Sequence, residues 1–210
     1  MRTALIHRQA FGVTLTHVRA AFGRIRANSG IGQALTFPDL HKLTEGLFLS
    51  AWTYWEGICR DVLVTDLAND GDGKLRSEIK KFRTKNAPLR LAECMLNHPD
   101  HPEKFVDWAE YRTVKERADE FLAAGHRFVP LPRNDDVTKL KRIRNAVAHR
   151  SDKAWESFRS LVTAAPFNLT PNQLKGITPG RFLCSHQWNG AWVLEEAVNV
   201  LESSALVLVP

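Results

Sequence analysis

Cysteine is scarce in this chain of 210 residues, and the three cysteines that it has are widely separated. A disulfide framework needs paired cysteines, and a zinc site needs ligands at close, regular spacing. Cys59, Cys94 and Cys184 satisfy neither requirement. We therefore predict that all three are buried thiols with a packing role.

A long apolar run is also missing. A membrane-spanning helix needs about 18 to 20 consecutive apolar residues, and no segment of the sequence comes near that length. The first residues lack the apolar block of a secretory signal, because His7, Arg8, His17 and Arg19 interrupt it. We expect a cytoplasmic protein with no membrane partner.

Metal ligands with a credible spacing are absent as well. The turn at residues 69–73 does not match a calcium-binding EF-hand loop, because Ala68 and Ser77 would occupy two ligand positions. Residues 98–103 contain two histidines, but two prolines mark this segment as a loop and no third ligand is evident. We expect neither a metal nor any other cofactor.

Acidic residues are missing from residues 1–38, which contain five arginines. Residues 74–90 hold seven basic residues against one acid, and residues 127–150 hold seven against two. The net charge of +6 is therefore unevenly distributed, which is typical of proteins that bind a polyanion such as RNA. Helices whose basic side chains only face solvent would give the same pattern.

The patterns that are present are helical. Apolar residues recur every three or four positions over residues 40–62, which predicts a long amphipathic helix from Pro38 onward. The sequence also predicts a short hairpin as an option within residues 181–192, in a region otherwise rich in turn residues. Further helices are predicted at residues 5–27, 74–85, 87–96, 105–124, 134–163 and 192–208.

No extended alternation of period two requires a sheet, so the fold class is all-α. The length suits one domain better than two. We predict a single helical domain over residues 1–210, with an N-terminal helical arm at 1–37, a core bundle at 38–165 and a C-terminal helical extension at 166–210.

The segment at residues 140–150 carries the most chemistry. On a helical wheel, five residues share one face and should lie in the core: Leu140, Ile143, Val147, Ala154 and Phe158. Asn145 and His149 lie one turn apart on the opposite face. Arg144 lies at the edge of the apolar face, where its long side chain can turn toward His149. A polar stripe that simply faces water is the alternative.

The run from Arg144 to His149 resembles the signature of the HEPN superfamily, in which an Arg with a polar residue after it precedes a His by four to six residues. In this sequence the polar residue is Asn145. The run at residues 49–56 is also similar to the family's helix that bears a small polar residue and an acid after an aromatic. The match in order and spacing covers roughly residues 38–163, and we place it in the RiboL-PSP-HEPN-like branch.

This resemblance implies an up-and-down helical bundle with additional terminal helices, and a metal-independent endoribonuclease. The RNA 2′-hydroxyl would attack the adjacent phosphorus to leave a 2′,3′-cyclic phosphate and a 5′-hydroxyl. His149 would move the proton, because imidazole titrates near neutrality. Arg144 would hold the phosphate, and Asn145 would orient His149 or the phosphate.

Other residues and partners are implied in the same way. Ser50 and Glu56 are supporting candidates at the cleft, although Glu56 is equally compatible with a structural role. The resemblance also implies a homodimer with the active cleft at its interface, and an antitoxin protein as a partner of a toxin or antiviral defence effector. Six basic residues are candidates for RNA binding: Lys141, Arg142, Arg150, Lys80, Lys81 and Arg83.

Two other function classes stay open. The chain would be a non-catalytic RNA- or nucleotide-binding module if the domain had lost its activity. It would be a protein-interaction module if it served a separate nucleotidyltransferase, since it has no glycine-rich phosphate loop of its own. We interpret Trp52, Trp55 and Trp155 as core aromatics rather than as platforms for base stacking.

Overall fold

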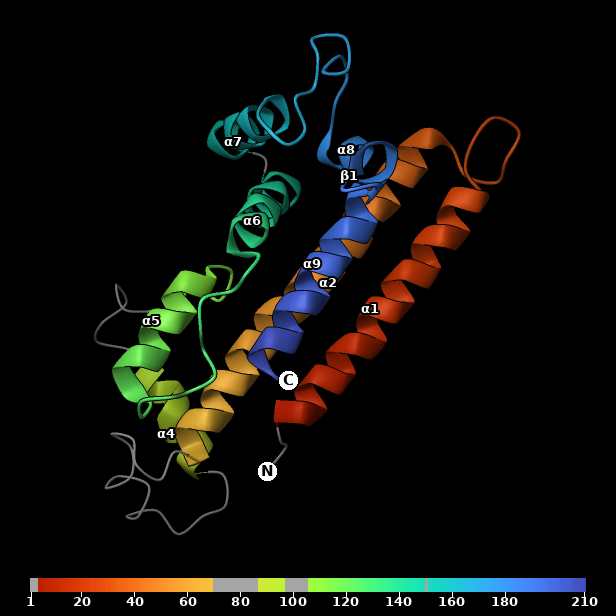
Figure 1. The fold of residues 1–210 in the computed structure, drawn as a ribbon. Helices are drawn as coiled ribbons and strands as arrows, with labels where there is room; N and C mark the ends of the chain where they lie inside the picture. The colour runs from red at the N-terminus through yellow and green to blue at the C-terminus, as the bar shows by residue number, and fades with distance from the viewer. Residues whose placement is uncertain (1–3, 70–86, 97–105, 150) are drawn as a thin grey trace. The chain divides into compact units, whose positions relative to one another are not determined.

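The computed structural model describes residues 4–69, 87–96, 106–149 and 151–210. These residues form eight α-helices and one two-stranded hairpin (Figure 1), so the fold is all-α, as predicted. The helices are α1 (Ala4–Ala27), α2 (Phe37–Asn69), α4 (Ala87–Leu96), α5 (Tyr111–Phe121), α6 (Asn134–Ala148), α7 (Asp152–Thr163), α8 (Pro179–Ser185) and α9 (Val193–Leu208). None of them is long and apolar enough to cross a membrane.

The chain divides into two compact units that are each discontinuous in sequence. Unit 1 comprises Met1–Phe11, Trp55–Asn134 and Ser204–Pro210, and unit 2 comprises Gly12–Tyr54 and Asp135–Ser203. The N-terminal arm, the core segment and the C-terminal extension named from the sequence each contribute residues to both units. The proposed boundaries at residues 37 and 165 therefore do not coincide with the division by contacts.

An aromatic row builds the core of unit 1. Trp55 of α2 is completely buried, with its ring centroid 6.4 Å from that of Phe11 and 6.2 Å from that of Tyr111 on α5. The Tyr111 hydroxyl donates a hydrogen bond to the carbonyl of Val129 at 2.9 Å. Large aromatic side chains bury much apolar area each, so this row joins α1, α2 and α5 in the core of unit 1.

A second aromatic cluster builds the core of unit 2. Phe182 on α8 packs edge-on against Phe158 of α7 at 5.7 Å and against Phe167 at 4.9 Å, measured between ring centroids. Phe167 in turn contacts Trp188 of β1 at 5.4 Å. These rings join α7, α8 and the hairpin of β1 (Gln187–Trp188) and β2 (Ala191–Trp192), so the region after α7 is packed rather than loose.

Several predicted helices match the structure closely. The expected helices at residues 5–27, 87–96 and 192–208 correspond to α1, α4 and α9, and the long helix from Pro38 is α2. The optional hairpin is present, with Asn189 and Gly190 at positive φ in its turn. The helix predicted at residues 74–85 lies outside the described residues.

The helix predicted at residues 105–124 is shorter than expected, because α5 begins only at Tyr111. Asp107 forms a turn before it: its carboxylate accepts a hydrogen bond from the backbone N–H of Ala109, and its carbonyl accepts one from Glu110. An Asp side chain that bonds the backbone two residues later offers the chain an alternative to helix. The composition of residues 105–124 is typical of a charged surface helix, so it did not indicate the turn before Tyr111.

The helix predicted at residues 134–163 is wrong as a single element, because it is divided into α6 and α7. Ser151 is the N-cap of α7, and its hydroxyl accepts a hydrogen bond from the N–H of Ala154 at 3.3 Å. Serine is a favoured residue at helix N-caps. The apolar residues keep their helical spacing across Ser151, so the pattern did not reveal the break between the two helices. The predicted turn region also contains α8, which is capped by Thr178 and opens with Pro179.

One cysteine prediction is wrong. Cys59 and Cys184 are buried, whereas Cys94 is exposed. Cys94 lies on the short helix α4, whose residues Ala92 and Leu96 are the ones buried in unit 1. The amphipathic face of α4, rather than the character of the thiol, decides which of its side chains reaches the core.

Candidate functional site

The residues of the signature lie at the C-terminal end of α6 in unit 2. Leu140 and Ile143 are completely buried and fix one face of this helix in the core, as the wheel predicted. The backbone N–H of His149 still donates to the carbonyl of Asn145 at 2.8 Å. His149 is therefore held one turn above Asn145, directly after the last residue of the helix.

Arg144, Asn145 and His149 form one hydrogen-bonded group. The Arg144 Nη1 lies 3.1 Å from the side-chain oxygen of Asn145 and 3.3 Å from Nε2 of His149. Arg144 and Asn145 are half-buried, and His149 is exposed. The predicted turn of the Arg144 side chain toward His149 is confirmed.

The chemistry of arginine decides the state of His149 in this arrangement. A guanidinium group only donates hydrogen bonds and is not deprotonated in proteins. The contact at 3.3 Å therefore requires Nε2 of His149 to accept. An imidazole with a lone pair on Nε2 is neutral and carries its proton on Nδ1, which is the form that a general base needs.

A hollow of about 310 Å³ opens beside His149 in unit 2. Its walls come from α2, from the junction of α6 and α7, and from the start of α8. The residues that line it are Lys42, Glu45, Ala146, Val147, His149, Ser151, Asp152, Trp155, Thr178 and Pro179. Val147 lines this hollow and is only half-buried, although the helical wheel placed it in the core.

A close approach of two backbones shapes one wall of the hollow. The N–H of Gly180 on α8 donates to a carboxylate oxygen of Glu45 on α2 at 3.0 Å, and the other oxygen of Glu45 lies 2.7 Å from the Lys42 ammonium. A Cβ atom on Gly180 would overlap the carbonyl of His41, with only 2.8 Å to its carbon. Glycine is therefore required where α8 meets α2.

Two other histidines of unit 2 have lowered pKa values. Burial lowers the pKa of His41, and the positive charge of Arg181 lowers it further. Burial likewise lowers the pKa of His186, again with a contribution from Arg181. Neither histidine is among the residues that line the hollow, so His149 is the histidine that the described residues place there.

The supporting candidates lie in different units. Ser50 is half-buried on the part of α2 that belongs to unit 2, and it is not among the described residues that line the hollow. Glu56 is half-buried on the part of α2 that belongs to unit 1. The structure thus groups Arg144, Asn145 and His149 but does not add Ser50 to them.

The candidate RNA-binding residues are only partly described. Arg142 donates to the hydroxyl and the carbonyl of Ser157 at 3.0 and 2.6 Å, so its guanidinium holds α6 to α7. Lys141 is half-buried on α6. The remaining candidates, Lys80, Lys81, Arg83 and Arg150, lie outside the described residues.

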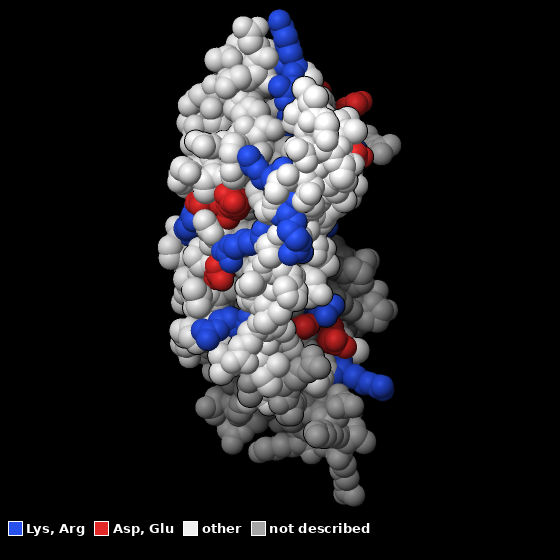
Figure 2. Space-filling model, turned by 90° about the vertical axis from the view of Figure 1, so that its right-hand side faces the viewer, with Lys and Arg blue, Asp and Glu red and all other residues white. Residues whose placement is uncertain are grey.

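Much of the basic charge near the N-terminus is used inside the protein. Arg19 of α1 pairs with Glu202 of α9 at 2.6 Å, and Arg26 lies over the ring of Trp192, 3.6 Å from its centroid. Arg8 donates to the carbonyl of Val209 at 2.9 Å. On the face drawn in Figure 2, basic side chains alternate with acidic ones and do not merge into one continuous patch. For residues 1–38 the count of arginines therefore overstates the positive charge that is left for a partner.

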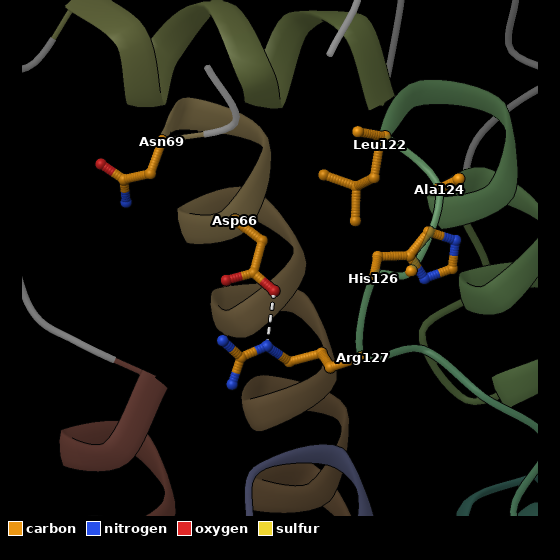
Figure 3. Close-up of a pocket in the computed structure, with 8 residues that line it drawn as sticks. Asp66, Asn69, Leu122, Ala124, His126 and Arg127 are labelled. Atoms are coloured by element: carbon orange, nitrogen blue, oxygen red, sulfur yellow. Dashed lines mark ion pairs between the residues drawn. The ribbon is translucent and has the colours of Figure 1, made fainter. Parts of the chain in front are cut away.

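Unit 1 has a separate hollow of about 440 Å³ that also contains a histidine and an arginine (Figure 3). There Arg127 forms an ion pair with Asp66 at 2.8 Å, and the ring of His126 points away from this pair. Nε2 of His126 lies 3.1 Å from a carboxylate oxygen of Asp119. A hydrogen bond from Lys115 lowers the pKa of Asp119, so this carboxylate stays ionised beside His126.

The sequence reasoning missed the residues that surround His149. Trp52 and Trp55 are buried, as predicted, but Trp155 is 37% exposed and lines the hollow, so the core assignment of Trp155 is wrong. Lys42 and Thr178 are distant from His149 in sequence and meet it only in the fold. The one sequence signal for this wall was the Thr-Pro pair that caps α8.

Comparisons with protein-family models, with curated proteins and with solved structures found no match for this chain. Among the described residues, no three His, Cys, Asp or Glu side chains lie close enough together to hold a metal ion. The site is thus defined by its own geometry: an imidazole, a guanidinium and an amide at the C-terminal end of α6.

Proposed function

We propose that this protein is a metal-independent endoribonuclease of the HEPN type, with Arg144, Asn145 and His149 as its catalytic group. The observation that carries the proposal is the contact between Arg144 Nη1 and His149 Nε2 at 3.3 Å on an exposed surface. A guanidinium and an imidazole at this distance are both within reach of one phosphodiester, which supports their assignment as anion-binding group and general base.

The proposed reaction begins with the 2′-hydroxyl of one nucleotide. Nε2 of His149 takes the proton of this hydroxyl while its oxygen bonds to the adjacent phosphorus. Arg144, which bonds His149 in the free protein, turns its planar donors to the phosphate oxygens and offsets the charge that builds on them. The P–O5′ bond then breaks, which leaves a 2′,3′-cyclic phosphate on one product.

The departing 5′-oxygen needs a proton to become a hydroxyl. His149 of the same chain has just accepted one, so a second imidazole in its protonated form would serve best as the general acid. A second copy of the chain would supply it if two signatures line one cleft, as the HEPN resemblance implies. The exposure of His149 at the end of α6 supports this arrangement, because the imidazole can face a partner.

The asparagine has a positioning role in this proposal. Its side-chain oxygen accepts a hydrogen bond from Arg144 at 3.1 Å, and its carbonyl accepts the backbone N–H of His149. Asn145 therefore contacts both partners and restrains the rotamer of the guanidinium. The biological role that fits such an enzyme is a toxin or defence effector restrained by an antitoxin protein.

The proposal is tested by incubating the purified protein with single-stranded RNA in EDTA and identifying the ends of the products. We expect cyclic phosphate and 5′-hydroxyl ends. Removing the base in His149→Ala should slow cleavage about 100- to 10,000-fold, and Arg144→Ala should slow it about 100- to 1,000-fold. His17→Ala is the matched control, because His17 is an exposed histidine of unit 2 on α1.

Two results would count against the enzyme. Cleavage that persists in both His149→Ala and Arg144→Ala would come from a different site or a contaminant. RNA binding by the wild-type protein without any cleavage would favour a non-catalytic binding module. A mass measurement in solution tests the pairing, and a strict monomer that cleaves RNA would exclude a shared cleft.

A further inference from the structure

Among the residues that line the hollow beside His149, Trp155 says most about the ligand that the hollow could bind. This indole is 37% exposed, although large aromatic side chains usually bury most of their surface. It packs on Phe158 of the same helix with 5.6 Å between ring centroids, and it lines the hollow together with His149. Phe158 is completely buried and anchors Trp155 from the core side. The arrangement presents a rigid aromatic surface toward the hollow.

The rim of the hollow carries hydrogen-bonding groups of both kinds. Ser151 and Thr178 each accept a helix N–H through the hydroxyl oxygen, at 3.3 and 3.1 Å, and each hydroxyl still has its own hydrogen to donate. Asp152 adds a carboxylate that only accepts. An aromatic surface with donors and an acceptor around it matches what a nucleobase offers: a π-face and a polar edge.

The size of the hollow limits what it can hold. At about 310 Å³ it lies at the lower end of the range for small-molecule sites. This volume suits one base with its sugar rather than a stretch of nucleotides. Lys42 also lines the hollow, with a side chain that is 72% exposed, and its ammonium lies 2.7 Å from the mostly buried carboxylate of Glu45. An ammonium has three donors, so Lys42 can bond a phosphate as well as Glu45.

We propose that this hollow is a base pocket, in which one unpaired RNA base stacks on Trp155 while the neighbouring phosphodiester lies at His149. The proposal rests on the function proposed above and adds to it a determinant of substrate choice: the RNA must be single-stranded where it is cut. Stacking of a base on an aromatic side chain contributes about 1 to 3 kcal/mol. Asp152 at the rim favours bases whose edges donate hydrogen bonds.

The pocket is tested by binding, so that the result does not depend on cleavage. The probe is a fluorescent 2′-O-methyl RNA oligonucleotide, which has no free 2′-hydroxyl to attack, and the readout is fluorescence anisotropy at fixed salt. Trp155→Ala should weaken binding about 5- to 100-fold, which corresponds to one lost stacking contact. Trp155→Phe should keep most of the affinity, because it retains an aromatic ring at the same position.

A matched control separates stacking from general loss of aromatic surface. Tyr54 is 51% exposed on α2 in the same unit and is not among the residues that line the hollow. Tyr54→Ala should therefore bind the probe like the wild type. Thermal melting of each variant identifies any that fail to fold. If Trp155→Ala is one of them, Trp155→Leu takes its place, because it keeps apolar volume without an aromatic ring and should show the same loss of binding.

An abasic probe sharpens the assignment. An oligonucleotide without bases keeps every phosphate and loses both the ring that would stack on Trp155 and the base edge that would bond the rim. The wild type should bind it more weakly than the intact probe, and Trp155→Ala should show a much smaller difference between the two. An undiminished difference in Trp155→Ala, or equal binding of the intact probe by Trp155→Ala and the wild type, would overturn the base pocket.

The two proposals fail separately. An enzyme that cleaves RNA through His149 but shows no effect of Trp155 on binding retains the active site and loses the pocket. A protein that shows the Trp155 effect but never cleaves retains the pocket and loses the ribonuclease. Binding by His149→Ala measures the pocket directly, because this substitution removes the proposed base and leaves Trp155 in place.

Discussion

Each unit contains a histidine and an arginine close in sequence, and the two pairs differ in their partners. In unit 1, Arg127 pairs with Asp66 at 2.8 Å and His126 lies 3.1 Å from Asp119. In unit 2, Arg144 contacts an amide oxygen and the imidazole of His149. Carboxylates offset the charge of the first pair, whereas Arg144 and His149 bond directly to each other. The comparison teaches that the same two residue types can pair with carboxylates or with each other, according to what the fold places beside them.

The tautomers of the two histidines sharpen the contrast. The backbone N–H of Phe128 donates to Nδ1 of His126, so Nε2 of His126 carries a proton and donates to Asp119. Nε2 of His149 instead accepts from Arg144. The side chain of His126 is only 15% exposed, while His149 is open to solvent. Nε2 is thus a hydrogen-bond donor to a carboxylate in His126 and a hydrogen-bond acceptor from a guanidinium in His149.

The largest expected effect comes from removing each histidine–arginine pair and comparing the two double variants. Arg144→Ala/His149→Ala should lower the rate of RNA cleavage at least about 100-fold, and the double variant should lose little more than the stronger single variant, because residues that act as a unit are not additive. Arg127→Ala/His126→Ala should leave the rate nearly unchanged. Product formation in EDTA and thermal melting are measured for both.

For thermal stability we expect the opposite order of effects, with the larger loss in the variant at residues 126 and 127. Loss of the half-buried Arg127–Asp66 pair should destabilise unit 1 by about 1 kcal/mol, or roughly 2 to 4 °C in melting temperature for a chain of this size. The variant at Arg144 and His149 should melt close to the wild type. A variant at residues 126 and 127 that loses cleavage while it melts normally would break the comparison, because it would place chemistry in unit 1.

The next effect concerns the wall of the hollow in unit 2. A methyl group on Gly180 overlaps the backbone of His41, so Gly180→Ala should cost about 1 to 3 kcal/mol of stability through overpacking. Gly46→Ala is the matched control on α2, where an added Cβ meets nothing within 4 Å. It should be neutral or stabilising by up to about 1 kcal/mol.

Denaturant unfolding of the two glycine variants gives the measurement. Equal free energies of unfolding for Gly180→Ala and Gly46→Ala would show that α8 does not depend on its close approach to α2. Cleavage by Gly180→Ala adds a second readout, since Thr178 and Pro179 line the hollow beside His149.

The smallest effect is expected in unit 1, where burial raises the pKa of Tyr111 far above its usual value. The unfolded chain ionises this phenol near pH 10 and the folded chain does not, so the folded state loses stability as the pH rises above about 10, by up to about 1.4 kcal/mol per pH unit. Below pH 10 the contribution is fully present. Tyr111→Phe should flatten this alkaline slope.

Tyr111→Phe also removes the hydrogen bond to Val129 at 2.9 Å, which should cost about 1 kcal/mol at neutral pH. Tyr54→Phe is the control, because Tyr54 is 51% exposed. The free energy of unfolding is measured from neutral pH to about pH 11, where the slope separates the variants. A slope that is unchanged in Tyr111→Phe would mean that this phenol ionises equally in both states.

Local patterns predicted the helices of this chain well and their ends poorly. The period of apolar residues indicated α1, α2, α4 and α9 to within a few residues, because burial of one face repeats every three to four positions. The same periodicity ran across Ser151 and hid the break between α6 and α7. Ser151 caps α7 by accepting a hydrogen bond from the N–H of Ala154, and His149 follows the end of α6 instead of lying within a longer helix.

The candidate site was predicted in part. Arg144 and His149 are near one another in sequence, so a helical wheel sufficed to bring them together, and the structure confirms the contact at 3.3 Å. Trp155, Lys42 and Thr178 were not found, because nothing local links them to His149. The counts of basic residues also overestimated the charge available to a partner, because Arg19 and Arg142 bond to other residues of unit 2.

The amino-acid sequence alone determined the all-α class, the positions of the long helices and the grouping of Arg144, Asn145 and His149, because each depends on neighbours within one or two helical turns. Only the tertiary structure decided the hollow around His149, the exposure of Trp155 and the internal use of the basic side chains. These properties depend on contacts such as the approach of Gly180 to α2, which join residues far apart in the chain and leave no periodic trace in it.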